Sequence, residues 1–119
     1  MPNKSQMTEE MRQCIANCLQ CHADCTETQM HCLTMGGDHA APMHQKLLAD
    51  CAQACITSAD FMLRMSDYHH EYCRICADLC RACGDDCERL AKNDRTMLKC
   101  AETCRRCEQT CRDMAMAAA

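Results

Sequence analysis

Residues 73–87 read CRICADLCRACGDDC. The five cysteines of this segment recur at steps of three and four residues: Cys73, Cys76, Cys80, Cys83 and Cys87. Because an α-helix has about 3.6 residues per turn, such steps keep side chains on one helical face. A stripe of this period normally consists of Leu or Ile and marks the buried face of a helix. The segment therefore predicts a helix whose buried face is made of thiols.

Two further segments repeat this spacing. Residues 14–25 read CIANCLQCHADC, residues 100–111 read CAETCRRCEQTC, and Cys32 follows the first run after seven residues. Between the runs, Cys51 and Cys55 stand four residues apart. We expect all of these thiols to face a common axis and to bind metal there. The complete set is Cys14, Cys18, Cys21, Cys25, Cys32, Cys51, Cys55, Cys73, Cys76, Cys80, Cys83, Cys87, Cys100, Cys104, Cys107 and Cys111.

Caps and helix breakers predict where the first two helices begin and end. Thr8 is a good N-cap and is followed by two glutamates, which suit the positive end of the helix dipole. Gly36 and Gly37 end the first helix. Pro42 suits the first turn of the second helix.

The later boundaries rest on polar residues. We expect the second helix to end near Met65, where Ser66 and Asp67 offer caps for a third helix. Asn93 and Asp94 offer caps for a fourth, so the third helix ends just before them.

Four helices joined by short links favour antiparallel neighbours. The predicted fold class is therefore all-α, an antiparallel up-down-up-down four-helix bundle with a cysteine-lined core. Residues 8–119 are expected to form this single domain, and residues 1–7 a flexible N-terminal tail.

Charge and hydropathy exclude several kinds of partner. The net charge of the 119 residues is -4 and both signs are mixed along the chain, so the basic patch of a nucleic-acid-binding protein is missing. No run approaches the ~20 apolar residues of a membrane span. Residues 1–11 contain no apolar segment typical of a secretory leader. We therefore expect a cytoplasmic protein with reduced cysteines and no nucleic-acid or membrane partner.

A core made of cysteines leaves space between its side chains, because Cys is smaller than Leu, and something else must occupy that space. Disulfides fit poorly, since Cβ atoms at i and i+4 stand about 5–6 Å apart and a disulfide needs about 3.5–4.5 Å. Two metal–sulfur bonds of ~2.3 Å in line span about 4.5 Å, which such a pair can reach. Seven pairs have this spacing: Cys14/Cys18, Cys21/Cys25, Cys51/Cys55, Cys76/Cys80, Cys83/Cys87, Cys100/Cys104 and Cys107/Cys111.

The charge of the thiolates favours a monovalent ion. Thiolates select soft ions such as Cu(I), zinc and the iron of iron–sulfur clusters. With 16 thiolates, ~4 Zn²⁺ would leave a buried charge of about -8, whereas ~16 Cu(I) would cancel it. We therefore predict that the core binds and stores multiple Cu(I) ions.

Two other metal functions stay open. An iron–sulfur (ferredoxin-like) or cysteine-based redox protein also needs many cysteines, although a regular alternation of three and four departs from the bacterial ferredoxin spacing. A zinc buffer is the other alternative. The sequence contains no combination of nucleophile, base and orienting group, so we do not expect an enzyme.

The three cysteine runs, the last followed by Arg112, Asp113 and Met114, resemble those of the bacterial copper storage proteins. The resemblance covers nearly the whole chain. It implies a cysteine-lined four-helix bundle that stores many Cu(I) ions reversibly and takes up metal at one open end. It also implies a homo-oligomer, often a tetramer, whose function is binding and not catalysis.

The resemblance extends to the open end of the bundle. The segment HCLTM, with His31 and Met35, followed by Met43, resembles the His/Met mouth of exported members of the family. In an antiparallel bundle, three further residues lie at this end: His39, His44 and Met97. Such side chains usually bind no metal. Methionines at the opposite end are expected to plug the core: Met7, Met11, Met62, Met65 and Met114.

Overall fold

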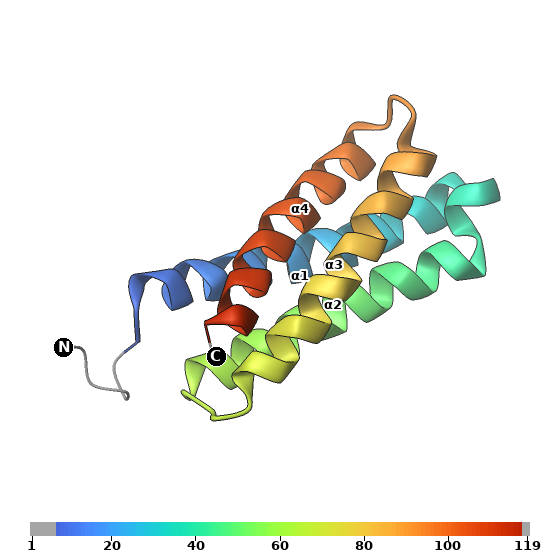
Figure 1. Ribbon diagram of the computed structural model, residues 1–119. Helices are drawn as coiled ribbons and strands as arrows, with labels where there is room; N and C mark the ends of the chain where they lie inside the picture. Colours follow the sequence, from blue (N-terminus) through green and yellow to red (C-terminus); the bar gives the residue numbers. More distant parts are fainter. Residues whose placement is uncertain (1–6, 118–119) are drawn as a thin grey trace.

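The computed structural model describes residues 7–117, which form a bundle of long helices (Figure 1). In chain order these are α1 (Glu9–Met35), the short 3-10 turn η1 (Gly37–Ala40), α2 (Pro42–Leu63), α3 (His69–Ala91) and α4 (Arg95–Met116). No strand occurs between residues 7 and 117. The predicted all-α fold class is confirmed.

The four helices run alternately up and down, as Figure 1 shows, and each packs on two neighbours. The pairs in contact are α1 with α2, α2 with α3, α3 with α4, and α4 with α1. This arrangement encloses one axis that all four helices face. None of the described helices combines the length and the apolarity that a bilayer span requires.

The first helix begins and ends where the sequence predicts. The hydroxyl of Thr8 accepts a hydrogen bond of 3.1 Å from the backbone N–H of Met11. At the other end, the backbone N–H of Gly36 donates to the carbonyl of Cys32 at 3.1 Å, with φ of 75° at the glycine. That conformation favours a residue without Cβ, which explains the stop.

The boundary between α2 and α3 differs from the prediction. The second helix ends at Leu63, and α3 begins at His69 without a side-chain cap, so Ser66 and Asp67 are not its N-caps. The chain leaves α2 through a Schellman turn with Met65 at φ 55°. In this turn the N–H of Ser66 donates to the carbonyl of Phe61 at 2.9 Å, and that of Met65 to the carbonyl of Met62 at 3.0 Å. No glycine marks this turn, so the sequence gives no sign of it.

The remaining boundaries are confirmed. Pro42 lies in the first turn of α2, and α3 ends at Ala91. Asp94 is the N-cap of α4, where its carboxylate accepts a hydrogen bond of 3.0 Å from the N–H of Met97. Of the predicted tail, residues 1–6 lie outside the described residues, and Met7 packs, half-buried, against the core.

Candidate metal centre

All sixteen cysteine side chains are buried, and every one is a free thiol. The helical stripes therefore face the bundle axis, as their spacing predicts. Because α1, α3 and α4 each contribute four or five thiols and α2 contributes two, the sulfur atoms replace the aliphatic core of an ordinary bundle.

The sulfur atoms form a continuous column along the axis. Twelve of the cysteines fall into five groups whose sulfur atoms all lie within 4.8 Å of one another. From one end of the bundle, the groups are Cys14/Cys73/Cys111, Cys18/Cys76/Cys107/Cys111, Cys55/Cys76/Cys80/Cys107, Cys21/Cys51/Cys55/Cys80 and Cys21/Cys25/Cys51/Cys104. Successive groups share one or two cysteines, so an ion in one group is linked to its neighbours by common sulfur ligands. The column continues beyond Cys25, whose sulfur lies 3.8 Å from that of Cys100.

The closest sulfur contacts join different helices. The sulfur of Cys111 in α4 lies 3.5 Å from that of Cys18 and 3.6 Å from that of Cys14, both in α1. Within single helices, three of the seven pairs expected from the sequence approach to 3.9 Å: Cys21/Cys25, Cys76/Cys80 and Cys107/Cys111. The candidate sites are therefore built between helices as well as within them.

These distances favour sites of three or more sulfurs. With metal–sulfur bonds of ~2.3 Å, two ligands lie about 4.0 Å apart in a trigonal site and about 4.6 Å apart in a linear one. The closest sulfur contacts lie between 3.5 and 4.0 Å, and the other sulfur pairs of the same groups lie within 4.8 Å. The closest contacts therefore fit a trigonal arrangement with little movement, whereas the longer distances also suit a linear one.

Protonation in the column is governed by neighbouring thiols. Hydrogen bonding to Cys100 and then to Cys104 raises the pKa of Cys25, with burial adding to the effect. Conversely, hydrogen bonding with Cys104 and then with Cys107 lowers the pKa of Cys21. At the end of the column, burial raises the pKa of Cys32 to about 11, reinforced by the charge of Asp94. Such a packed set of thiols cannot ionise together without cations among them.

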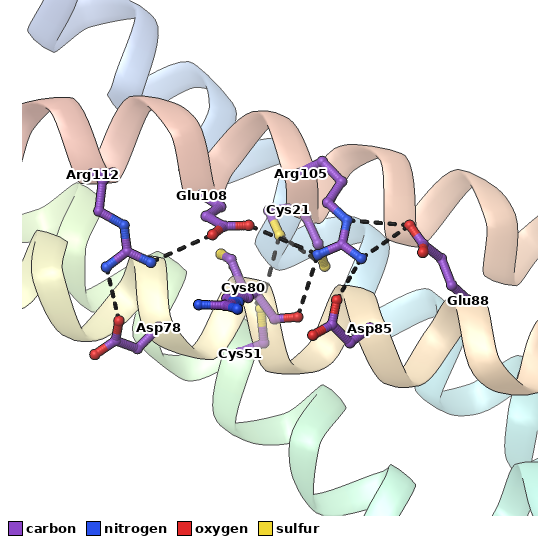
Figure 2. A network of polar contacts seen from close by, with 11 residues as sticks. Cys21, Cys51, Asp78, Cys80, Asp85, Glu88, Arg105, Glu108 and Arg112 are labelled. Atoms are coloured by element: carbon purple, nitrogen blue, oxygen red, sulfur yellow. Dashed lines mark hydrogen bonds and ion pairs between the residues drawn. The ribbon is translucent and has the colours of Figure 1, made fainter.

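On the outer surface, arginines of α4 form ion pairs with carboxylates of α3 (Figure 2). Arg105 donates to the carboxylate of Asp85 at 2.6 Å, and Arg112 donates to that of Asp78 at 2.8 Å. Figure 2 also shows Cys80 of α3 near Cys21 of α1 and Cys51 of α2. On α3, the carboxylates of Asp78 and Asp85 are exposed and the thiol of Cys80 is buried, so ion pairs and thiols occupy different faces of this helix.

Gly84 explains how closely α3 and α4 approach. A Cβ at this position would lie 3.2 Å from the guanidinium of Arg105 and 3.3 Å from Cβ of Cys104. A side chain here would therefore push α4 away. The isolated glycine within a helical pattern has a packing role, which brings the thiols of the two helices together.

A buried histidine lies at one end of the column, beside Cys32. Nε2 of His44 lies 3.4 Å from the sulfur of Cys32, and Nδ1 lies 2.7 Å from the carboxylate of Asp86. Arg89 donates to the other oxygen of Asp86 at 2.7 Å. Burial opposes ionisation of Asp86, but the hydrogen bonds from Arg89 and His44 outweigh it and lower the pKa of the carboxyl. The carboxylate of Asp86 accepts from Nδ1–H, so Nε2 of the same ring is the atom that faces Cys32.

The spacing of His44 along its helix already indicates that its side chain is buried. His44, Leu48, Cys51 and Cys55 recur at steps of four, three and four, and all four are buried. His44 therefore extends the buried stripe of α2. The burial of Asp86 could not be predicted from spacing in this way, because it depends on the neighbouring helices.

The predicted mouth residues lie at this end but are not gathered on the column. The side chains of Met35 and Met43 are 56% and 69% exposed, whereas Cys32 is fully buried. Nε2 of His31 lies 2.8 Å from the carboxylate of Asp94. His39 is half-buried, and beside it a cleft of about 670 Å³ opens between η1 and the link from α3 to α4. Their role as ligands stays a prediction, as does that of the fully buried Met97.

The methionines at the opposite end pack as predicted. We call this the methionine end and define it by Met7, Met11, Met62, Met65 and Met114. Met11, Met62 and Met114 are buried, and Met7 and Met65 pack, half-buried, against the core. They close the column beyond its last group, Cys14/Cys73/Cys111.

Comparison with known proteins places this geometry in a family. A family model of copper storage proteins matches residues 7–116. Among curated proteins, none is similar enough to count as a relative. Several solved structures, however, superpose on nearly the whole chain.

Three of these structures illustrate the similarity. The Nmul_A1745 protein from Nitrosospira multiformis is 39% identical, with 92% of this chain and 97% of that one covered at a TM-score of 0.86. The copper storage protein Ccsp from Streptomyces lividans, loaded with 10 copper equivalents, is 30% identical over 97% of this chain and 91% of its own, with a TM-score of 0.81. Cu(I)-bound copper storage protein BsCsp3 is 30% identical over 90% and 99%, with a TM-score of 0.83.

Proposed function

The chain belongs to the copper storage protein family, and on this premise we propose that it stores many Cu(I) ions on the thiolates of its core. The observation that carries the proposal is the column of fused sulfur groups, in which adjacent groups share cysteines. Shared thiolates let a large number of ions lie close together, since each sulfur bridges two of them. The ligands that we propose are the sixteen cysteines, with Cu(I) as cargo.

The chemistry of loading follows from burial and charge. Each thiol that binds loses its proton to solvent, and the bound Cu(I) supplies the positive charge that the buried thiolate needs. Because the ion carries one charge, loading can approach one ion per thiolate and still leave the core neutral. The oxidation state of copper does not change, so the protein needs no catalytic group, and we propose that it is not an enzyme.

The elongated column of thiols favours Cu(I) over the two alternatives, an iron–sulfur cluster and zinc. A ferredoxin-type cluster needs four thiolates around one compact core and leaves the others idle. Here twelve thiols belong to overlapping groups, and Cys21, Cys51 and Cys55 each belong to two of them. Zinc in tetrahedral sites would leave about half of the thiolate charge uncompensated. Cu(I) is the ion that uses all of the groups.

We propose that copper enters at the end where α1 meets α2. The exposed thioethers of Met35 and Met43 are soft donors that can capture Cu(I) from solution, with His31 beside them. Cys32 and His44 form the first buried pair behind them, and their sulfur and nitrogen are 3.4 Å apart. From this pair the ion passes to the thiolates of the column.

The setting that we propose is the cytoplasm. One structurally similar protein is a cytosolic copper storage protein from Streptomyces lividans with five coppers, 32% identical to this chain. Free thiols at all sixteen positions suit a reducing compartment. We further propose that the subunits form a homo-oligomer, as the family resemblance implies, with neither nucleic acid nor membrane as a partner.

Anaerobic titration of the reduced protein with Cu(I) against a competing chelator tests storage. We expect uptake of many equivalents, with about one proton released for each thiolate formed. Uptake of only one or two equivalents would contradict storage. A coloured protein after anaerobic purification would favour an iron–sulfur cluster instead, because Cu(I) thiolate has no visible absorption.

A further inference from the structure

The methionine end holds a histidine that neither the plug nor the column explains. His69 is the first residue of α3 and stands four residues before Cys73, so both side chains lie on the same helical face. Its side chain is only 8% exposed. A buried histidine is unexpected at an end of the bundle that methionines otherwise close.

One nitrogen of this imidazole lacks a hydrogen bond. Nδ1 of His69 is buried and finds no partner among residues 7–117. The ring packs on that of His70 with centroids 3.8 Å apart, a contact that satisfies no polar group. Buried polar atoms are nearly always hydrogen-bonded, since an unpaired one costs stability. The unpaired nitrogen therefore calls for a ligand that the protein itself does not supply.

The nearest sulfur group has room for another donor. Cys14, Cys73 and Cys111 form the only one of the five groups with three sulfurs instead of four, counting the residues that the structure describes. Burial lowers the pKa of His69, with His70 adding to this, while Cys14 acts in the opposite direction. The imidazole is thus held neutral, with a free lone pair, within the electrostatic reach of a column thiol.

We propose that His69 binds a Cu(I) ion together with the thiolates of Cys14 and Cys73, which makes a mixed nitrogen and sulfur site at the methionine end. The site deepens the proposed storage function and rests on it. Neither ring nitrogen forms a group with the sulfurs of Cys14 and Cys73 in which all three atoms lie within 4.8 Å of one another, so the ring must turn about its side-chain torsions to bind. On binding, Cys14 and Cys73 each release a proton to solvent, the neutral imidazole donates a lone pair, and copper stays Cu(I).

The site would give the column an imidazole at both ends. His44 meets Cys32 at the mouth, and His69 stands beside Cys73 at the methionine end. Imidazole is a harder donor than thiolate and holds Cu(I) less firmly, so ions at the two ends exchange more readily than those between.

A pair of neighbouring substitutions tests the site. His69→Leu removes the nitrogen and keeps an apolar side chain of similar length, and His70→Leu is the matched control on the next residue. Anaerobic Cu(I) titration against a chelator should show one equivalent fewer for H69L than for the wild type and no change for H70L. X-ray absorption of loaded H69L should show weaker copper–nitrogen scattering than that of loaded H70L.

Two further measurements separate the possible outcomes. The urea midpoint of metal-free H69L should equal or exceed that of the wild type, because an unpaired buried nitrogen is removed. Anomalous density for copper within about 2.0–2.1 Å of His69 in crystals of the loaded wild type supports the site even if H69L does not fold. Equal capacity in H69L and wild type, or full loading without copper at His69, overturns the inference but leaves storage intact. Uptake of one or two ions by the wild type overturns both.

Discussion

The imidazole of His44 faces the thiol of Cys32 across 3.4 Å, inside the bundle and away from solvent. Asp86 accepts a hydrogen bond of 2.7 Å from the far nitrogen of the ring and so orients the near one. Carboxylate partners of this kind fix the tautomer of metal-binding histidines and raise their basicity. The pair therefore presents one nitrogen and one sulfur at the point where the column opens.

Replacing Asp86 should weaken the site at the mouth without emptying the column. We expect Asp86→Asn to lower Cu(I) affinity there by about 10- to 100-fold, because the histidine loses its orienting partner. Stopped-flow uptake and chelator competition measure the effect. His22→Leu is a control on a histidine outside the column, since Nδ1 of His22 bonds to the carbonyl of Ala52. Equal affinity in D86N and wild type would remove Asp86 from this role.

The sharing of cysteines predicts unequal losses of capacity. Cys107 belongs to two sulfur groups and Cys73 to one. We therefore expect Cys107→Ser to reduce the number of bound Cu(I) ions more than Cys73→Ser does, with little change in helicity for either variant. Titration with thiol counting and far-ultraviolet circular dichroism give the two quantities. If both substitutions cost the same number of ions, the groups are independent sites and not a fused column.

A side chain at Gly84 should separate α3 from α4. Gly84→Ile places atoms where Cβ alone already meets Arg105 and Cys104 at 3.2 to 3.3 Å. We expect a loss of about 1–3 kcal/mol in the free energy of unfolding of the metal-free protein, as is common for overpacking. Urea denaturation measures this loss, and Arg81→Ile at an exposed position of the same helix is the control. An unchanged midpoint would mean that the two helices do not need their close approach.

The N-cap of α4 predicts a loss of stability in acid. Burial disfavours ionisation of Asp94, but the N–H of Met97 and the ring of His31 outweigh it and lower the pKa of the carboxyl below its usual 3.8. A lowered pKa in the folded state means that the stabilisation is complete above about pH 4 and is lost as the pH falls through the folded-state pKa.

Substitutions of Asp94 separate its capping role from its charge. Asp94→Ala should lower the free energy of unfolding by about 1 kcal/mol at neutral pH, the typical value of an N-cap. Asp94→Asn keeps an N-capping side chain but has no carboxyl group to titrate, so its stability should not fall with the pH in the same way. Urea midpoints of the metal-free proteins between pH 5 and pH 3 check both. A wild-type midpoint that follows the same pH profile as that of D94N would contradict the assignment.

Much of this protein follows from residues close together in the chain. Thr8, Gly36 and Asp94 act within one turn of their own helices, so the sequence predicts the boundaries that they make. The end of α2 near Met65 was predicted to within two residues, but the turn that follows it was not, because Met65 adopts a left-handed conformation that its residue type does not suggest. Likewise, the steps of three and four placed every cysteine on a buried face, since helix geometry alone determines which side chains share a face.

Which thiols meet is decided only by the tertiary structure. The contact of Cys18 with Cys111, and the grouping of Cys21 with Cys104, depend on the rotation of each helix and its shift along the axis. Packing between helices sets both quantities, and spacing within one helix leaves them free. The same holds at the ends of the column, where His44 turned inwards and Met43, one residue earlier, turned outwards. The sequence by itself therefore determined that the core is made of thiols, and the packing of four helices decided which of them can share an ion.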